Sequence, residues 1–573
     1  MTRRDFLLSS AAAASLATVG RPALAAADAT PDAILQGLIR DHDARIPALL
    51  AQQDNRPGHR WSGGLADGHG IHTVSGTNGF VAALAAAACA PGSKYFGSEA
   101  LAEPMRRGIA YMLKAQHADG TIDYYATNFH STPDLAFILE HACPACTLLR
   151  ASPVPALRAV ADELGQFIRR AGEALVVGGV HTPNHRWIVC SALAWVNSLY
   201  PDRRYVARVD QWLAETIDLD PDGQYTEKST TVYSPHVNRA LLTVARLLNR
   251  PELAEPVRKN LEMTIYYVHP DGEVVTEASR RQDRYQRGSL APYYYSYRTL
   301  ALRDGNGRFA AMARQIERSL APRHPGSLTT FLTEPEFGRP LPPDAPLPTD
   351  YAKVFSYSSL ARIRRGQVSG TVLAANTTLF SFRKGAAALE AVRFATAFFG
   401  KGQFTADALE VKDGRYVLRQ ELDGPYFQPL TAQQIADGEH VKMAPNGTLA
   451  NHKNWRARSE VQALQATVTI TEKNGAFDLA FAIRGTEFVP VAIELAFRHG
   501  GTLEGVKPAP GVKDGWLLEG GTGRYSLGND TIEFGPGRVE HTYTQVRGAL
   551  PKWDGQCVYL TGATPFEFTL RIS

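Results

Sequence analysis

The sequence predicts a multidomain α+β protein, with an N-terminal (α/α) toroid of helical hairpins followed by a C-terminal antiparallel β-sandwich domain. Two observations support this fold class. Before residue 335, apolar residues recur every three or four positions, the period of a helix, whereas beyond it they alternate with polar residues, the period of a strand. A proline-rich connector from Gly338 to Pro348 separates the two patterns. We therefore expect a toroid domain over residues 26–335 and a β-sandwich domain over residues 336–573.

The helical segments come in pairs, joined by loops rich in Gly, Pro, Asp and His. Helical hairpins repeated in this way are typical of a toroid, and a helical solenoid that only binds other proteins is the alternative interpretation. The expected helices are residues 79–90, 99–118, 134–149, 154–174, 185–199, 203–217, 232–248, 251–267 and 308–320.

The second part of the chain contains short alternating segments, separated by turns such as Lys473-Asn474-Gly475. Many strands at close spacing favour a β-sandwich. The expected strands are residues 370–382, 415–420, 461–471, 476–483, 488–497, 523–527 and 566–572.

The composition is that of an ordinary globular protein. Of the 573 residues, 44% are hydrophobic and 21% are charged, and the formal net charge is +4. A charge balance this even does not indicate nucleic acid binding, so no nucleic acid partner is expected. Cys143 and Cys146 have the spacing of a metal or redox hairpin, but the five cysteines include no second such pair. We expect no metal and no cofactor.

The N-terminus resembles an export signal. Residues 2–8, TRRDFLL, form a twin-arginine pattern, an apolar run continues to Val19, and Ala23-Leu24-Ala25 is a small-residue cleavage site. We therefore expect residues 1–25 to be a cleaved signal peptide and the protein to be periplasmic or secreted. No later run of about eighteen apolar residues follows, so no membrane anchor is expected.

Two stretches of the helical part combine polar groups at helix starts. Asn184 and His185 follow a Thr-Pro helix start, where the helix dipole and free N–H groups would favour an anionic ligand. Tyr233 and His236 share one face of a helix that begins one hairpin later. Because successive hairpins of a toroid present equivalent ends to the same cleft, we expect His185 and Tyr233 to meet there.

These residues resemble a known family. An Asn-His pair at a helix start, followed one hairpin later by Asp222-Gly223, Glu227, Ser229 and Tyr233, is similar to the heparinase II/III and alginate lyase group of polysaccharide lyases. The resemblance implies a toroid-plus-β-sandwich enzyme that acts on an anionic polysaccharide or oligosaccharide. It further implies β-elimination of a uronic-acid-containing glycan, with removal of the C5 proton and cleavage of the C4–O bond.

The chemistry of that reaction needs these residue types. The carboxylate beside C5 must be neutralised before the proton can leave, and the Asn184 amide is suited to this, at about 3–4 kcal/mol for a well-aimed donor. A base must then take the C5 proton and an acid must protonate the leaving oxygen. Ordinary pKa values near 6.5 for His and 10 for Tyr suit His185 as the base and Tyr233 as the acid, and the family also permits Tyr233 in both roles.

Further side chains are candidates for substrate binding. Guanidinium groups bind carboxylate or sulfate in pairs of hydrogen bonds, and aromatic faces stack on sugar rings. A loop rich in Arg is followed by a Tyr-rich run, and His residues occur in other polar stretches. The expected substrate-binding residues are Arg280, Arg281, His236, His130, Tyr294 and His452.

Two other functions remain open at this point. A glycoside hydrolase on an α-toroid would need two carboxylic acids facing each other across a sugar. A non-catalytic glycan-binding protein would use the Arg and aromatic loops without any reaction. Lyase products carry a C4–C5 double bond that absorbs in the ultraviolet, and hydrolase products do not. The carboxylates that could serve a hydrolase are Asp123, Asp134, Glu227 and Glu277.

Overall fold

The computed structural model describes residues 30–438, 441, 443, 445–448 and 453–573. The chain divides into two compact units, one comprising the residues up to Val268 and Gly272–Pro348, the other His269–Asp271 and Thr349–Ser573. The expected signal peptide and His452 lie outside the described residues. Within the part that is described, no helix is both long and apolar enough to cross a membrane.

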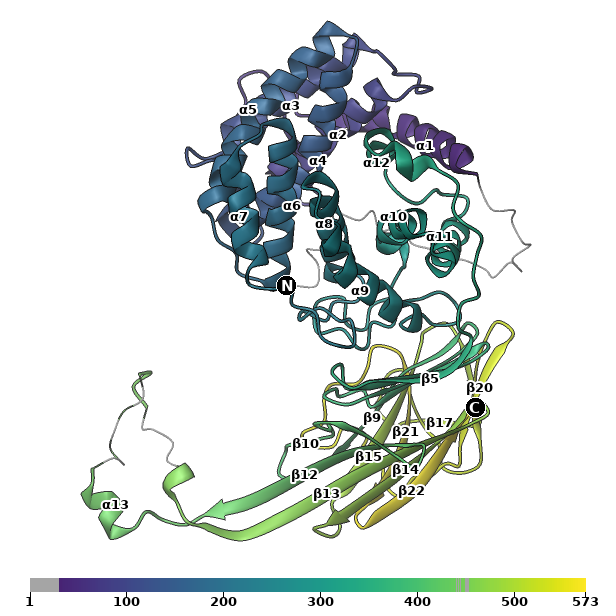
Figure 1. Cartoon of the computed structure of the whole chain (residues 1–573). Helices are drawn as coiled ribbons and strands as arrows, with labels where there is room; N and C mark the ends of the chain where they lie inside the picture. The colour runs from purple at the N-terminus through teal and green to yellow at the C-terminus, as the bar shows by residue number, and fades with distance from the viewer. Residues whose placement is uncertain (1–29, 439–440, 442, 444, 449–452) are drawn as a thin grey trace. The chain divides into compact units, whose positions relative to one another are not determined.

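The first unit is built from helices, as the sequence predicts (Figure 1). Its inner helices are α2 (Val74–Cys89), α4 (Thr132–Ala151), α6 (Pro183–Leu199), α8 (Tyr233–Leu247), α10 (Tyr294–Asp304) and α12 (Leu328–Thr333). Its outer helices are α1 (Pro31–Gln52), α3 (Ala102–Ala115), α5 (Pro155–Val177), α7 (Arg203–Leu213), α9 (Ala254–Tyr266) and α11 (Gly307–Leu320). Two short hairpins accompany them, β1 (Leu65–Ala66) with β2 (His72–Thr73) and β3 (Ile122–Tyr124) with β4 (Asn128–Ser131).

The helices form a toroid of hairpins. Helices α2, α4, α6 and α8 pack against one another in succession, and each also packs against the odd-numbered helix that follows it. In Figure 1, α4, α6, α8, α10 and α12 surround the centre of the ring, and α3, α5, α7, α9 and α11 lie outside them. One continuous hydrophobic core joins both rings. Parallel inner helices place their N-terminal ends, and the loops before them, on one face of the ring.

Four of the described α-helices were not among those expected: the long helices α1 and α10 and the short helices α12 and α13 (Ala432–Ala436). Helix α1 carries Pro47 in its interior and several charged residues, which weakens the helical pattern in its sequence. Helix α10 begins at Tyr294, inside the tyrosine-rich run that the sequence presents as a binding segment. The tyrosines of α10 are buried because they pack between α8, α9 and α11 rather than face solvent.

The proline-rich connector packs against the helical unit. Arg298 donates to the carbonyls of Phe337 (2.7 Å) and Arg339 (2.8 Å), and Arg314 donates to that of Pro342 (3.0 Å). The division between the two units therefore falls after Pro348, at the end of the connector, and not at residue 335 where the sequence pattern changes.

The second unit is a β-sandwich of two sheets. One sheet has the order β17-β18-β21-β15-β9-β8-β7-β6-β5 with β10 paired to β9, and the other has the order β11-β12-β13-β14-β22-β20-β19-β16. The strands of the first sheet are β5 (Asp350–Phe355), β6 (Leu360–Arg365), β7 (Val368–Leu373), β8 (Phe380–Lys384), β9 (Ala387–Thr396), β10 (Gly402–Gln403), β15 (Pro490–Phe497), β17 (Lys507–Pro508), β18 (Gly515–Leu517) and β21 (Gln556–Ala563). Those of the second are β11 (Leu409–Lys412), β12 (Arg415–Phe427), β13 (Arg458–Lys473), β14 (Ala476–Gly485), β16 (Thr502–Glu504), β19 (Gly523–Leu527), β20 (Asp530–Gly535) and β22 (Phe566–Ile572).

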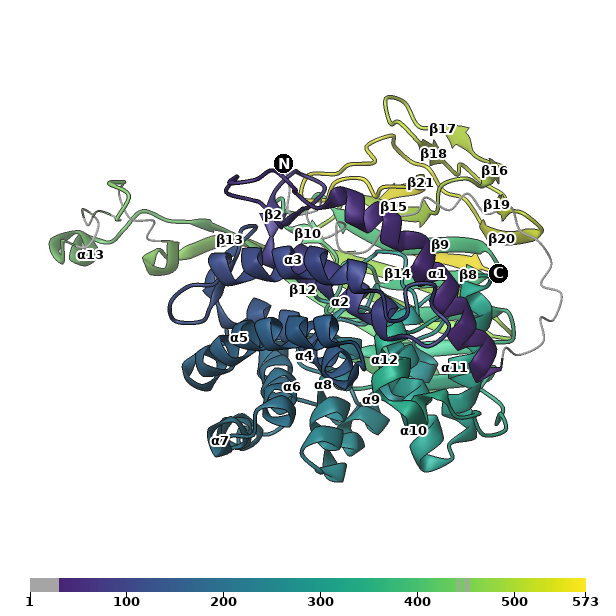
Figure 2. The same ribbon diagram turned by 90° about the horizontal axis from the view of Figure 1, so that it is seen from above.

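The two sheets share an aromatic core. Phe380 of one sheet meets Phe477 of the other at 5.0 Å between ring centroids, and Phe394 meets Phe481 at 5.5 Å. The pairing is antiparallel except between β18 and β21, which run parallel. Strands β12 and β13 continue as a ribbon that carries the short helix α13 (Ala432–Ala436) near its tip, and Figure 2 shows β16 to β20 gathered on one side of the sandwich. The predicted fold class is confirmed.

Candidate active site

Helix α6 begins at the residues that the sequence singles out. Thr182 is its N-cap and Pro183 its first residue, but the Thr182 side chain makes no capping hydrogen bond. Instead, the Glu227 carboxylate accepts hydrogen bonds from the Asn184 backbone N–H (2.9 Å) and from its side-chain amide (2.5 Å). The negative charge of Glu227 therefore lies at the positive end of the helix dipole. This N–H group is already satisfied, rather than left free for an anionic substrate as the sequence suggested.

Asn184 is buried and only partly satisfied. One amide hydrogen goes to Glu227, and the other goes to Thr182 Oγ1 at 3.2 Å. Its Oδ1 is also buried but accepts no hydrogen bond. A buried oxygen without a donor costs about 1–3 kcal/mol. The Asn184 amide is therefore a place where a bound molecule can supply a missing hydrogen bond.

Arg186 turns away from this amide. Its guanidinium pairs with Glu215 (3.0 Å) and Asp218 (3.1 Å) and stacks on Trp187. Arg186 therefore ties the start of α6 to the segment that follows α7. Of the three polar residues that begin α6, only Asn184 and His185 are left as candidates for the active site.

Tyr233 lies at the start of α8, where an Arg and a Gln of one loop surround it. Gln282 Nε2 donates to its hydroxyl at 2.7 Å, and the Arg281 guanidinium lies over its ring, 5.1 Å from the centroid. Arg281 also pairs with Glu227 at 3.4 Å. The network Tyr233–Arg281–Glu227–Asn184 is therefore continuous and joins the starts of α6 and α8.

A buried aspartate holds that loop in place. Asp283 is 2% exposed, and its carboxylate accepts hydrogen bonds from the backbone N–H and the hydroxyl of Thr231, each at 3.0 Å, and from Ser279 Oγ. Because Thr231 lies just before α8 and Asp283 just after Arg281 and Gln282, these bonds fasten the loop against the phenol of Tyr233. Ser229 Oγ accepts from the Tyr233 backbone N–H at 3.1 Å and so supports the same helix start.

His185 is half-buried beside this network. Its ring meets His181 edge-on at 4.8 Å and Phe137 at 6.1 Å, and its Nδ1 is buried without a partner. Burial lowers the pKa of His185 to about 4, and the neighbouring His181 and Arg281 act in the same direction. The imidazole is therefore neutral at neutral pH and able to accept a proton. Arg281 is thus an electrostatic neighbour of both His185 and Tyr233.

The other expected binding residues lie in different surroundings. Arg280 is exposed beside Lys228, whose pKa it helps to lower after burial. Tyr294 is in the core, 1% exposed, and donates to Glu317 at 2.7 Å. His130 is exposed on β4, where its ring stacks on His117 at 3.8 Å and its Nδ1 lies 2.9 Å from Asp119. His236 is the exception, because its ring contacts Phe137, the residue that also contacts His185.

Several residues near the site could not be predicted from the sequence pattern. Gln282 is a loop residue among arginines, and Phe137 reads as one more apolar residue of a helix face. Tyr124 lies close enough to Tyr233 and Asp134 for both to raise its pKa, although burial is the main cause. Only Asp134, which accepts from Asn128 (2.7 Å) and Ser131 (2.5 Å), stands in a visibly polar stretch.

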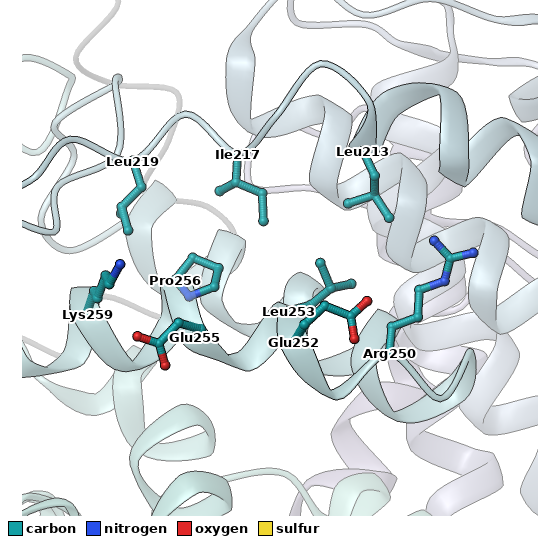
Figure 3. Close-up of a pocket in the computed structure, with 9 residues that line it drawn as sticks. All are labelled: Leu213, Ile217, Leu219, Arg250, Glu252, Leu253, Glu255, Pro256 and Lys259. Carbon is teal, nitrogen blue, oxygen red and sulfur yellow. The ribbon is translucent and has the colours of Figure 1, made fainter.

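No metal site is evident in the described ranges, which contain no group of three or more His, Cys, Asp and Glu side chains placed to hold an ion. A pocket of about 450 Å³ lies elsewhere on the helical unit, between the end of α7 and the start of α9 (Figure 3). Its lining combines apolar side chains with charged side chains of both signs. None of the residues discussed above lines it; those that do are Leu213, Ile217, Leu219, Arg250, Glu252, Leu253, Glu255, Pro256 and Lys259.

Comparisons with known proteins identify the fold. No protein-family model and no curated protein sequence matches the chain. Among solved structures, a chondroitin AC lyase from Streptomyces coelicolor A3 in complex with chondroitin sulphate is similar with a TM-score of 0.55 at 14% identity, over 97% of this chain and 80% of that one. A Paenibacillus xanthan lyase has a TM-score of 0.52 at 11% identity, over 94% of this chain and 57% of that one. Heparinase III has a TM-score of 0.50 at 12% identity, over 97% of this chain and 85% of that one. The chain therefore has the toroid-plus-β-sandwich fold of these polysaccharide lyases, as the Asn-His and Tyr stretches predicted.

Proposed function

We propose that the protein is a polysaccharide lyase that cleaves a uronic-acid-containing glycan by β-elimination. The observation that supports this most strongly is the continuous network that joins Asn184, Glu227, Arg281 and Tyr233 beside His185. It brings an amide, a cation, a phenol and a neutral imidazole to one end of the toroid. These are the groups that removal of a proton next to a carboxylate requires.

Asn184 and Arg281 neutralise the uronate carboxylate in this proposal. The Asn184 hydrogen bond to Thr182, at 3.2 Å, is the longer of its two amide bonds and is the one that a carboxylate can replace. The Arg281 side chain is 36% exposed, whereas its partner Glu227 is 7% exposed, so the guanidinium can contact substrate while it stays paired. Donors aimed at developing negative charge are each worth about 2.7–4 kcal/mol of barrier.

His185 and Tyr233 exchange the protons. The neutral imidazole of His185 accepts the C5 proton, and a bound carboxylate nearby would raise the pKa of His185 and strengthen it as a base. Gln282 donates to the Tyr233 oxygen, which leaves the phenolic hydrogen free for the leaving O4. Arg281 over the ring stabilises a phenolate, so Tyr233 can also serve as the base when C5–H and O4 lie on the same side of the sugar.

The hydrolase alternative finds less support in the side chains. Glu277 is buried, and the three other candidate carboxylates are engaged by neighbours as follows. Glu227 accepts from Asn184, Asp134 accepts from Asn128 and Ser131, and Asp123 lies 2.8 Å from His117 Nε2. A hydrolase needs one of its carboxyl groups free to protonate the leaving oxygen.

An ultraviolet assay tests the proposal directly. Purified protein is incubated with alginate, hyaluronan, chondroitin sulfate, heparan sulfate, xanthan and ulvan, and absorbance of the C4–C5 double bond and new reducing ends are both followed. A lyase produces the two signals together. Reducing ends without absorbance would establish a hydrolase, and binding without either signal would establish a glycan-binding protein. The twin-arginine pattern adds the proposal that the protein is exported to the periplasm or beyond, which fractionation of cells producing the full chain would test.

A further inference from the structure

Polar side chains continue along α8 beyond Tyr233. His236 and Arg239 follow at intervals of three residues, which places all three on one side of the helix. With a rise of 1.5 Å per residue, Arg239 lies about 9 Å further along the helix axis than Tyr233. This stripe runs from the N-terminal end of α8, where the proposed reaction takes place, to the middle of the helix.

Helix α4 presents a matching stripe. Phe137 makes edge contacts with His185 at 6.1 Å and with His236 at 5.7 Å, so one aromatic ring separates the proposed base from the second histidine. One turn further, His141 lies close enough to His236 and Arg239 for both to lower its pKa. The two stripes therefore face each other.

Both histidines are in contact with solvent and are also surrounded by protein atoms. His141 and His236 are exposed to solvent, yet burial among surrounding protein lowers the pKa of each to about 4, with Arg239 acting in the same direction. At neutral pH both imidazoles are neutral, and each retains one N–H that can donate a hydrogen bond.

Arg239 has no anionic partner among the described residues. Its guanidinium makes one close contact, with the face of Tyr295 at 5.4 Å, and Tyr295 donates its own hydroxyl to Glu334 at 3.0 Å. Two carboxyl groups interact with Arg239 electrostatically. Glu140 is buried and accepts from Ser191 Oγ at 2.5 Å, and Glu334 is already paired with Arg246 at 3.3 Å. Burial raises the pKa of both carboxyl groups, which makes them poor counter-ions for Arg239. An unpaired guanidinium inside a protein is costly unless an anion completes it.

We propose that His141, His236, Arg239 and Tyr295 form a second subsite, which binds a carboxylate or sulfate on the sugar next to the one that is cleaved. The proposal rests on the proposed lyase function and narrows its substrate class to glycans that carry negative charge on adjacent sugars. Arg239 supplies the charge and a pair of donors, the two imidazoles supply further N–H groups, and Tyr295 holds the guanidinium flat.

The first experiment does not depend on catalysis. Inorganic sulfate is titrated into the whole protein at constant ionic strength, and the imidazole NMR signals of His141 and His236 are followed after assignment with the His141→Gln and His236→Gln variants. We expect saturable shifts in the wild type and in Arg170→Gln, which removes an exposed arginine from the outer helix α5, and no saturable shift in Arg239→Gln. Equal titrations of Arg239→Gln and the wild type would overturn the subsite, whether or not any glycan is cleaved.

The second experiment separates a substrate subsite from a site for a free anion. Calorimetry in a Tyr233→Phe background compares tetrasaccharides of alginate, of heparan sulfate sulfated on every glucosamine, and of hyaluronan. Of these three, only hyaluronan has an uncharged sugar beside each uronate. Arg239→Gln should weaken binding of the first two at least tenfold and leave hyaluronan binding within twofold, while Arg239→Lys should recover part of the loss. Sulfate binding could depend on Arg239 while the binding of every tetrasaccharide is unchanged in Arg239→Gln. In that case the site holds a free anion and the proposal is wrong. If no glycan is cleaved while the sulfate result holds, the lyase function fails and the anion site stands.

Discussion

Glu227 accepts two hydrogen bonds from Asn184, one from its backbone N–H at 2.9 Å and one from its amide at 2.5 Å. A single carboxylate thus caps helix α6, orients the amide proposed to neutralise the substrate, and pairs with Arg281. The buried Glu227 carboxylate therefore supports both the fold and the proposed reaction. Substitutions at this point should therefore change stability and rate together, which distinguishes Glu227 from residues that only react.

Glu227→Ala should lower both the stability and the rate. Loss of the carboxylate leaves two buried donors of Asn184 without an acceptor, at a cost of about 1–3 kcal/mol each in the free energy of unfolding. Urea denaturation measures this directly. Glu227→Gln keeps an acceptor oxygen of the same size and should lose less stability while its rate still falls, because Arg281 loses its partner. A Glu227→Ala protein as stable as the wild type would contradict the capping role.

Tyr233→Phe should abolish turnover and leave binding largely intact. The substitution removes the hydroxyl that receives the Gln282 hydrogen bond and preserves the ring under Arg281. General acid–base catalysis contributes about 10²–10⁴-fold, so kcat should fall by at least a hundredfold. Calorimetric affinity for an uncleaved oligosaccharide should stay within a few-fold. Near-normal turnover would exclude Tyr233 from proton transfer.

Asn184→Ala should reduce kcat by about 10²–10³-fold, the loss typical of one donor aimed at a developing oxyanion. Because this variant also removes a partner of Glu227, its stability must be measured beside its rate. Asn184→Asp serves as the matched control, since it keeps the size of the side chain but turns a donor into a repelling charge. A small effect of Asn184→Ala on kcat, with the fold intact, would remove Asn184 from the neutralising role.

Arg281 and Arg280 should differ although they are neighbours in the chain. Arg281 lies over Tyr233 and pairs with Glu227, whereas Arg280 is exposed beside Lys228. Arg281→Gln should lower kcat/KM at least tenfold, and Arg280→Gln should have a much smaller effect at moderate ionic strength. Steady-state kinetics of both variants on the same glycan provide the comparison. Equal losses would show that the exposed arginine also reaches the substrate.

Stability should fall as the pH decreases from about 6.5 to about 4. The pKa values of His141, His185 and His236 are lowered from 6.5 to about 4, with burial as the largest cause. The unfolded chain therefore binds these protons at a higher pH than the folded chain, and protonation within this window favours unfolding. Urea denaturation across the window should show a shallower pH dependence for His141→Gln and His236→Gln. Curves parallel to that of the wild type would mean that the folded histidines titrate normally.

Much of the fold was predictable because its signal is local. The start of α6 at Thr182-Pro183, and the shared face of Tyr233 and His236, follow from near-neighbour spacing and the known geometry of a helix. The change from a helical to a strand period predicted the two-part architecture for the same reason. Helix α10 was missed because its tyrosines, read as a binding surface, pack into the core and donate inward to partners such as Glu317.

The sequence by itself determined the two-part fold class and identified Asn184, His185 and Tyr233 as candidate catalytic residues. Both predictions depend on patterns formed by residues a few positions apart. Only the tertiary structure decided that Glu227 caps α6 from 43 residues away and that Arg281, not Arg280, lies over Tyr233. It also placed His141 and Arg239 on facing helices. The physical reason is that a loop's path depends on long-range bonds, such as those between Asp283 and Thr231, which no local periodicity records.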